Sequence, residues 1–399
     1  MCSKDMAVVT LKSGHVQPVW AGHPWVYAQA VQRVDGGAAP GDEVDVVDPQ
    51  GRLLGRGLYS PTSAIPVRLY TRDRSAPFDA AYVSQRIARA AERRRRLGLP
   101  GAGTNAYRLV HAEGDELPGL VVDCFDDVLA VQFGTFGLHR RSAMILDVLG
   151  RLLSPKSIVD RTSESIARAE NFTPGGGVVW GDTKVDELGF VELGLRYRIP
   201  LTLGQKTGFY LDQRPLRARV EQLAAGRRVL DTFAYVGAMS MAAARGGASE
   251  VRMVESNAQA LRVAAACAED NGLSDRIHFD CRDARAALQQ AGGQGGYELT
   301  ICDPPKLAPT RAARKKALQA MRRLAGLACR ATCRGGHLVL CSCSSAIGMG
   351  ELTRALALGA RDAGQRPIVL ERIFQGPDHP VPAAFTEGLY LITLLVEMA

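Results

Sequence analysis

The feature of this sequence that most constrains its fold is a series of four short apolar segments between residues 229 and 303, each followed by a carboxylate. The carboxylates are Asp231, Glu255, Asp283 and Asp303. Enough residues separate successive segments to form a helix, and strands that alternate with helices predict an open parallel sheet. Such strands all end at one edge of the sheet, and that edge is where ligands bind. We therefore expect four carboxylates along one edge, and we expect that edge to be the site.

The turn after the first strand is expected to bind a cofactor. It reads Asp-Thr-Phe-Ala-Tyr-Val-Gly at 231–237 and lacks the Gly-x-Gly-x-x-Gly pattern that a pyrophosphate needs, which argues against a nicotinamide enzyme. S-adenosylmethionine has no phosphate, and it needs a carboxylate for its ribose and a pocket for its methionine end. The residues expected to bind it are Phe209, Asp231, Phe233, Tyr235, Gly237, Glu255, Asp283, Ala284 and Asp303.

Asp303 and Cys343 suggest the chemistry. Asp303 precedes two prolines that fix the backbone, so its carboxylate is expected to point out of the sheet edge and to grip the polar edge of a planar base. Cys343 follows the next strand, where a thiolate could add to C6 of a pyrimidine and make C5 nucleophilic. Asp303 would then bind N3 and stabilise the charge on the base. A strand-ending turn and a packing thiol remain the alternatives, and Cys341 is expected to be structural.

A basic segment follows Asp303. The formal net charge is +8, and residues 201–399 contain 25 basic and 18 acidic residues. Residues 306–334 contain nine basic residues and no acidic one, so we expect this segment to face a polyanion rather than to be a salt-bridged surface helix. The candidate RNA contacts are Pro304, Lys306, Arg311, Lys315, Arg322 and, in a later loop, His379.

The chain of 399 residues predicts three domains. Residues 1–73 contain short strands joined by Gly and Pro turns and predict a small β-barrel, residues 74–200 predict an α+β domain, and residues 201–399 predict the α/β domain. Within the middle domain we expect a helix over 79–97, with Arg86, Arg89 and Arg93–Arg96 facing outward, a hairpin over 120–133 and a strand over 191–199. The last strand of the chain is expected to run antiparallel.

Cysteine usage and hydropathy indicate a cytoplasmic protein. The nine cysteines are an odd number in mostly apolar contexts, which is typical of reduced thiols. Cys329, Cys333, Cys341 and Cys343 match no standard zinc spacing, and Cys329 and Cys333 are expected on a helix while the other two end a strand, so no metal is expected. Neither a signal peptide nor a membrane-spanning segment is expected.

Several motifs resemble one known family over essentially the whole chain. They are His23-Pro24-Trp25-Val26, Gly57-x-Tyr59-Ser60-Pro61, Lys206-Thr207-Gly208-Phe209-Tyr210-Leu211-Asp212-Gln213-Arg214, Asp303-Pro304-Pro305-Lys306, Ser342-Cys343-Ser344, Asp378-His379-Pro380 and Glu387-Gly388-Leu389-Tyr390-Leu391. The sequence resembles the bacterial PUA-containing 23S ribosomal RNA cytosine-5 methyltransferases. The resemblance implies an N-terminal PUA-like β-barrel, a middle α+β domain and a C-terminal Rossmann-like, seven-stranded class I methyltransferase domain, with Cys343 as nucleophile. Ala234, Val236 and Ala238 depart from the family's usual Ser, Thr and Gly.

The hypothesis is an enzyme that methylates C5 of a cytosine in 23S ribosomal RNA with S-adenosylmethionine, through a covalent adduct between Cys343 and C6. The expected partner is naked or early-assembly ribosomal RNA, with no membrane partner, and a homodimer is left open. Two alternatives stay open. One is a methyltransferase that acts on an exocyclic nitrogen or on another RNA, and the other is a non-catalytic, cofactor-sensing RNA-binding or ribosome-assembly protein.

Overall fold

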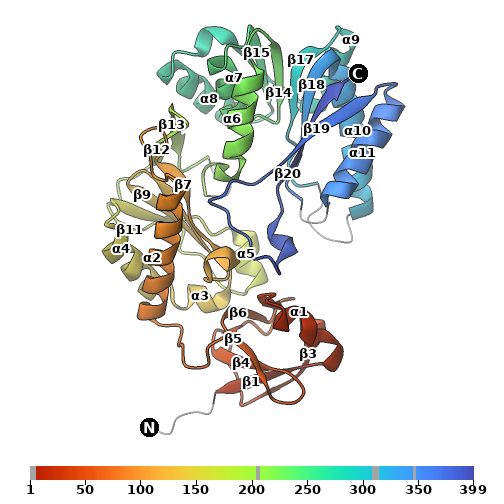
Figure 1. Ribbon diagram of the computed structural model, residues 1–399. Helices are drawn as coiled ribbons and strands as arrows, with labels where there is room; N and C mark the ends of the chain where they lie inside the picture. The colour runs from red at the N-terminus through yellow and green to blue at the C-terminus, as the bar shows by residue number, and fades with distance from the viewer. Residues whose placement is uncertain (1–5, 204–206, 308–313, 345–346) are drawn as a thin grey trace. The chain divides into compact units, whose positions relative to one another are not determined.

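The computed structural model of the protein describes residues 6–203, 207–307, 314–344 and 347–399 (Figure 1). Its contacts divide the chain into two compact units, and the chain passes between them several times. Unit 1 contains Met1–Glu192, Pro200–Leu211 and Pro377–Thr386, and unit 2 contains Leu193–Ile199, Asp212–Gly376 and Glu387–Ala399. The three-domain division with boundaries at 73 and 200 remains a prediction.

The N-terminal part of unit 1 is a six-stranded sheet in the order β2-β6-β5-β4-β1-β3. Alternating valines and leucines of this sheet are buried in one core, as expected for strands with one solvated face. Glycine is required at position 57, where β5 pairs with β6, because a Cβ there would lie 2.5 Å from the carbonyl oxygen of Arg68. The elements are β1 (Ala7–Leu11), η1 (Ser13–His15), α1 (Val16–Trp20), β2 (Trp25–Val26), β3 (Val31–Asp35), β4 (Glu43–Val47), β5 (Leu53–Tyr59) and β6 (Val67–Thr71).

The second part of unit 1 is a five-stranded sheet in the order β11-β10-β9-β8-β7 with helices packed against it. The predicted hairpin is confirmed as β8 and β9, with Asp126 at φ +56° in its turn. The predicted helix is confirmed as α2, and the Asp79 carboxylate caps it by accepting from the Tyr82 backbone N–H at 2.8 Å. The elements are α2 (Ala80–Arg96), β7 (Ala106–His111), β8 (Leu120–Phe125), β9 (Val128–Phe133), α3 (Phe136–His139), α4 (Ser142–Leu153), β10 (Ser157–Asp160), α5 (Glu164–Ala169) and β11 (Gly177–Gly181).

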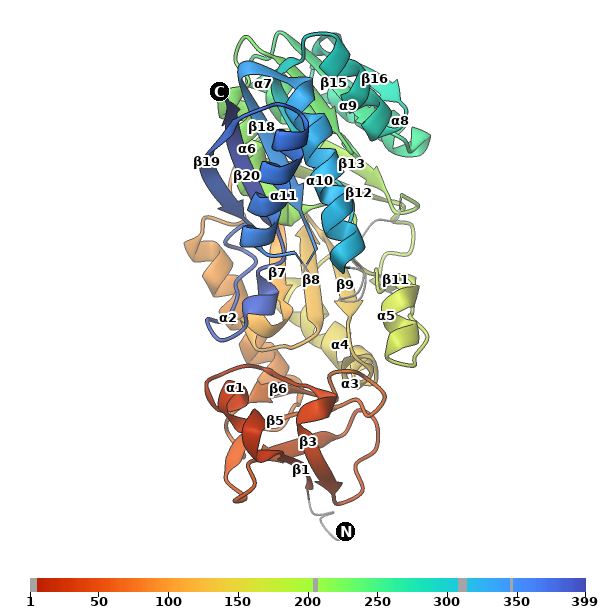
Figure 2. The same cartoon turned by 90° about the vertical axis from the view of Figure 1, so that its right-hand side faces the viewer.

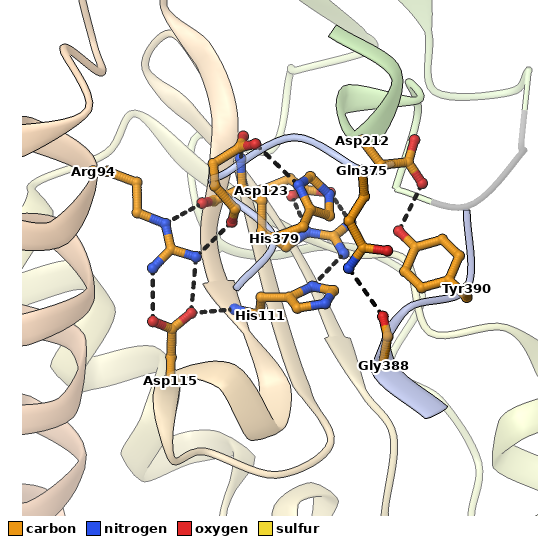
Figure 3. Close-up of polar contacts among 11 residues, drawn as sticks. Arg94, His111, Asp115, Asp123, Asp212, Gln375, His379, Gly388 and Tyr390 are labelled. Carbon is orange, nitrogen blue, oxygen red and sulfur yellow. Dashed lines mark hydrogen bonds and ion pairs between the residues drawn. The ribbon is translucent and has the colours of Figure 1, made fainter. Parts of the chain in front are cut away.

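The prediction that Arg94 faces outward was wrong. Its side chain is 1% exposed and forms a two-point ion pair with Asp115, with Nη1–Oδ1 and Nη2–Oδ2 distances of 2.7 and 2.8 Å (Figure 3). It also donates to the carbonyl oxygens of Arg108 at 2.7 Å and Asp378 at 2.6 Å. A buried guanidinium needs acceptors for its donors, and these four contacts supply them.

Unit 2 is built on a seven-stranded sheet in the order β16-β15-β14-β17-β18-β20-β19, with helices on both faces (Figure 2). Strands β14 to β18 are parallel to one another, and β20 runs antiparallel to β18 and β19, which confirms the expectation for the last strand. The strands are β14 (Arg228–Thr232), β15 (Glu250–Glu255), β16 (Ile277–Cys281), β17 (Tyr297–Cys302), β18 (Thr332–Ser342), β19 (Pro367–Phe374) and β20 (Ile392–Met398). The helices are α6 (Arg214–Leu223), α7 (Ala238–Arg245), α8 (Ala258–Asp270), α9 (Ala284–Gly293), α10 (Arg314–Ala331) and α11 (Met349–Asp362).

Two sequence-based assignments need correction. The single strand expected over 191–199 is two strands, β12 (Glu187–Glu192) and β13 (Leu195–Pro200), separated by Leu193 at φ +50° and Gly194 at φ +77°. Apolar periodicity continued through this turn and hid it. Cys333, which we expected on a helix, lies in β18.

Within the described ranges, no helix is long and apolar enough to cross a membrane. In the same part of the chain, no group of three or more His, Cys, Asp or Glu side chains is placed to hold a metal ion.

Candidate active site

The sheet of unit 2 brings its strand ends to one edge. In the parallel register Thr232 pairs with Cys302, and Cys302 pairs with Leu340. The turn after β14 and Asp303 after β17 therefore begin at the same level of the edge, whereas β18 continues to Ser342 and Cys343 follows it. Asp303 and Cys343 thus follow neighbouring strands, as the sequence predicted.

The turn after β14 holds an unusual backbone. Phe233, Tyr235 and Gly237 all have positive φ, at +62°, +54° and +73°. Aromatic residues rarely adopt the left-handed region, and such strain persists where the surroundings impose it, commonly at ligand sites. Gly237 is favoured by its φ of +73°, and a Cβ there would in addition lie 2.8 Å from Sδ of Met253. Gly237 is the N-cap residue of α7, so the helix begins directly after this turn.

Glu255 fixes this turn from the end of β15. Its Oε2 accepts from the Tyr235 backbone N–H at 2.9 Å, and its Oε1 accepts from the Asn257 backbone N–H at 2.8 Å. These bonds orient the carboxylate. Oε1 also accepts from Ser256 Oγ at 3.2 Å, whereas Oε2 accepts one of these bonds and has a second lone pair, so the orientation fits a group that accepts from a ribose hydroxyl.

Asp231 lies inside the unit. It is 1% exposed, and Ser240 Oγ donates to its Oδ2 at 2.7 Å. Burial raises the pKa of Asp231 to about 7, and the nearby charges of Asp303 and Glu255 also raise it, against the lowering effect of the Ser240 hydrogen bonds. The parallel register brings the ends of β15 and β17, which lead to Glu255 and Asp303, beside the end of β14, which leads past Asp231. Asp231 is buried and contacts Ser240 in the first turn of α7, so we expect it to support the site rather than to contact a cofactor directly.

Asp283 and Ala284 begin α9. The Asp283 Oδ1 atom accepts from the backbone N–H groups of Arg285 at 2.9 Å and Ala286 at 3.0 Å, so this carboxylate caps the helix. Asp283 is exposed and Ala284 is buried. A cap at an exposed helix start remains compatible with a contact to the cofactor's adenine.

Asp303 is half-buried, and Gln213 holds it. The Gln213 Nε2 atom donates to Asp303 Oδ2 at 2.6 Å, and Gln213 is 7% exposed. Our set of site residues did not include Gln213. The signal was present in the sequence, because Gln213 belongs to the Lys206–Arg214 motif, but no local pattern indicates which distant side chain an amide will contact.

The cysteines at the end of β18 differ in exposure. Cys341 is buried, accepts from Thr393 Oγ1 at 3.3 Å, and has a thiol pKa raised well above its ordinary value by burial and by the nearby charge of Asp303. Cys343 is half-exposed. A nucleophile needs access, so Cys343 is the better placed of the two.

The expected RNA contacts have different environments. Pro304 is buried, whereas Lys306 and Lys315 are exposed. Arg322 is ion-paired with Asp362 at 2.6 Å, and Arg314 is ion-paired with Glu351. The expectation that this segment has no acidic partners was therefore wrong, because α11 supplies them from outside the basic run. Arg311 lies outside the described residues.

Two expected site residues belong to unit 1. Phe209 is 2% exposed and packs edge-on against Phe190, with ring centroids 5.1 Å apart. His379 is also 2% exposed, and its Nδ1 lies 3.0 Å from Oδ1 of Asp378. A side chain this buried cannot lie on an RNA-facing surface. Its place in the structure is a core position beside His111, whose ring centroid lies 5.0 Å away (Figure 3).

Comparisons with known proteins agree with this architecture. A family model described as a PUA-like domain matches residues 9–72, and one described as an S-adenosylmethionine-dependent methyltransferase matches residues 124–391. The chain is similar to proteins named ribosomal RNA large subunit methyltransferase I. The one from Pseudoalteromonas translucida is 31% identical over 394 residues, which cover 98% of this chain and 99% of that protein. The one from Shewanella denitrificans is 33% identical over 393 residues, with the same coverage.

Solved structures share the fold. One of a methyltransferase complexed with SAH superposes with a TM-score of 0.86 at 18% identity and covers 98% of this chain and 100% of that one. Another, of a methyltransferase from Streptococcus mutans, has a TM-score of 0.82 at 17% identity, with the same coverage. These matches confirm the fold class, a PUA-like domain followed by a Rossmann-like methyltransferase domain, and S-adenosylmethionine as the cofactor. The chain belongs to the family of S-adenosylmethionine-dependent methyltransferases, among the members that begin with a PUA-like domain.

Proposed function

We propose that this enzyme methylates C5 of a cytosine in 23S ribosomal RNA. Relatives that match over nearly their whole length are named as ribosomal RNA large subunit methyltransferases, and they support an RNA substrate of this kind. The observation that carries the choice of C5 is that Cys343 is only partly buried and directly follows β18, the strand next to the one that leads to Asp303. Such a substrate would place the enzyme with naked or early-assembly RNA in the cytoplasm.

Cys343 supplies the nucleophile that a pyrimidine C5 requires. Its thiolate adds to C6 of the cytosine, a bond forms between sulfur and C6, and the electron pair of the 5,6 double bond makes C5 nucleophilic. After methyl transfer to C5, loss of the C5 proton and breakage of the sulfur–C6 bond restore the aromatic ring. The neighbouring Cys341 cannot act in this way, because its thiol is buried and its pKa is raised.

Asp303 binds and orients the base. A base that enters this edge would meet the Asp303 carboxylate, which can contact its polar edge at N3 while charge develops on the ring. Gln213 fixes the rotamer of Asp303 through the 2.6 Å hydrogen bond and so prepares that contact before the base arrives.

The residues present fit S-adenosylmethionine, which supplies the transferable methyl group when bound. Glu255 would hold its ribose, the strained turn at Phe233, Tyr235 and Gly237 would line its methionine end, and Asp283 with Ala284 would lie at its adenine. Lys306 and Lys315 are exposed and would contact RNA phosphates.

The decisive test compares Cys343→Ala with Cys341→Ala, a matched control two residues away. We expect Cys343→Ala to abolish tritium transfer from labelled S-adenosylmethionine to 23S ribosomal RNA, and Cys341→Ala to retain it. RNA that carries 5-fluorocytosine should trap a covalent complex with the wild-type chain and with Cys341→Ala, but not with Cys343→Ala.

The alternatives predict other outcomes. Full activity of Cys343→Ala without a trapped complex would indicate methylation of an exocyclic nitrogen. Absence of transfer by the wild-type chain to any ribosomal RNA would indicate a non-catalytic RNA-binding protein. Mass mapping of ribosomal RNA from cells that lack the gene would identify the base and its position.

A further inference from the structure

Trp20 is unusually exposed for a tryptophan. It ends α1 in the PUA-like domain, and 74% of its surface is open to solvent, more than for any other large hydrophobic side chain that the structure describes. A lone exposed apolar residue needs no explanation, and exposure becomes informative only where a site adjoins it. Figure 2 shows α1 at the surface of this domain.

A groove adjoins Trp20. Its volume is about 510 Å³, and two segments line it: η1 with α1 on one side, and the turn between β4 and β5 with the start of β5 on the other. This volume lies within the range of about 300–1,000 Å³ that is usual for small-ligand sites, so a nucleoside fits. The lining residues are Ser13, Val16, Gln17, Trp20, Asp48, Arg52, Leu53 and Leu54.

The charges around the groove favour an anion. Residues 6–34 contain no carboxylate, and exposed Lys12 precedes the groove residue Ser13. The groove's one carboxylate belongs to Asp48, which is 2% exposed and accepts from Arg52 Nε at 2.6 Å and from the backbone N–H groups of Gln50 and Arg52 at 2.9 Å each. The Arg52 side chain remains 77% exposed. Asp48 therefore orients a guanidinium that is still open to a ligand.

We propose that this groove binds one unpaired nucleotide of RNA, with the base stacked on Trp20 and a phosphate beside Arg52. An aromatic face next to an oriented arginine is the combination by which proteins hold single-stranded nucleic acid, since stacking accepts any base and the cation binds the backbone. The inference rests on the proposed function in one respect only, that RNA is the substrate class. It assigns the PUA-like domain a contact outside the nucleotide that is methylated.

The test measures binding of the full chain to a short fluorescein-labelled single-stranded RNA of mixed sequence, and to the same sequence as a duplex, by fluorescence anisotropy. We expect Trp20→Ala to weaken single-strand binding by about tenfold to a hundredfold, and Trp20→Phe, which keeps an aromatic face, to stay near wild type. Arg52→Ala should lower the slope of log Kd against log salt by about one. Arg33→Ala is the matched control, because Arg33 is an exposed arginine of the same domain, paired with Asp35 at 2.8 Å, away from the groove.

The outcomes separate this inference from the proposed function. Single-strand binding by Trp20→Ala equal to that of wild type overturns the groove proposal, whether or not methyl transfer persists. A change of oligomeric state in Trp20→Ala with unchanged RNA binding also overturns it, because the groove would then be a protein interface. Conversely, Trp20-dependent RNA binding in a chain that transfers no methyl group to 23S ribosomal RNA supports the groove and refutes the proposed function.

Discussion

Replacing Arg94 by alanine should destabilise unit 1 by about 3–5 kcal/mol, the usual cost of removing one partner from a buried ion pair. The side chains of Arg94 and Asp115 are 1% and 0% exposed, and the pair is joined at two points. Loss of the guanidinium would leave the Asp115 carboxylate with fewer donors, and it would leave the carbonyl oxygens of Arg108 and Asp378 without this donor. Arg94→Met should lose nearly as much, because it restores volume but no donors.

Arg93 offers a matched control. It also contacts Asp115, but its side chain is 46% exposed, so Arg93→Ala should cost at most about 1 kcal/mol. Urea unfolding monitored by tryptophan fluorescence reports on unit 1 alone, because the three tryptophans, Trp20, Trp25 and Trp180, all belong to it. A loss in Arg94→Ala no larger than in Arg93→Ala would refute the reasoning, and recovery of stability in Arg94→Met would show that the loss is one of packing.

Three further predictions concern the site. Burial raises the pKa of Asp231 from an ordinary value of 3.8 to about 7. The protonated carboxyl group therefore adds to the free energy of unfolding fully below pH 3.8, and this contribution is lost as the pH rises to about 7, by up to about 4 kcal/mol. Asp231→Asn should flatten this dependence in urea unfolding followed by circular dichroism. Gly237→Ala should weaken S-adenosylmethionine binding in calorimetry. The control is Gly247→Ala, which is also at positive φ but has no atom within 3.7 Å of the added Cβ. It should lower the free energy of unfolding only by the backbone strain of about 1–2 kcal/mol and leave cofactor binding intact. Gln213→Ala should lower kcat by roughly tenfold through a mispositioned Asp303 and leave the cofactor Kd unchanged, and a matching loss of affinity would contradict the positioning role.

The sequence predicted the part of the site that follows from strand order. Carboxylates at the ends of neighbouring parallel strands must lie at one edge, and the register of β14, β15 and β17 brings residues 231, 255 and 303 to it. Likewise, Cys343 follows β18 and Asp303 follows its neighbour β17, because apolar strand length and the alternation with helices locate both ends. These features depend on local pattern and on the geometry of parallel sheets alone.

The sequence pattern could not predict contacts between side chains that lie far apart along the chain. Arg94 lies on the same helical face as the buried residues Val83, Ile87 and Ala90, but its charge led us to expect it in solvent. It is buried because Asp115 and the carbonyl oxygen of Asp378, 284 residues away, supply its acceptors. The same holds for His379, which the sequence groups with the methyltransferase domain and the structure buries in unit 1. Periodicity records which side chains prefer water, but it cannot reveal that an ion pair will be completed elsewhere.

The position of Gln213 follows from contacts that unite two distant motifs of unit 2. The Asp212 side chain accepts from Tyr390 Oη at 2.6 Å (Figure 3). The Asp212 carbonyl oxygen accepts from the Gly376 backbone N–H at 2.9 Å. The Gln375 amide nitrogen in turn donates to the carbonyl oxygen of Gly388 at 2.9 Å. Asp212, the residue before Gln213, is therefore held by the segment between β19 and β20. These contacts position Gln213, the N-cap residue of α6, so that its side chain reaches Asp303. The Asp-Gln-Arg and Gly-Leu-Tyr motifs thus act on the site together, because one holds Asp303 and the other holds the residue that leads to it.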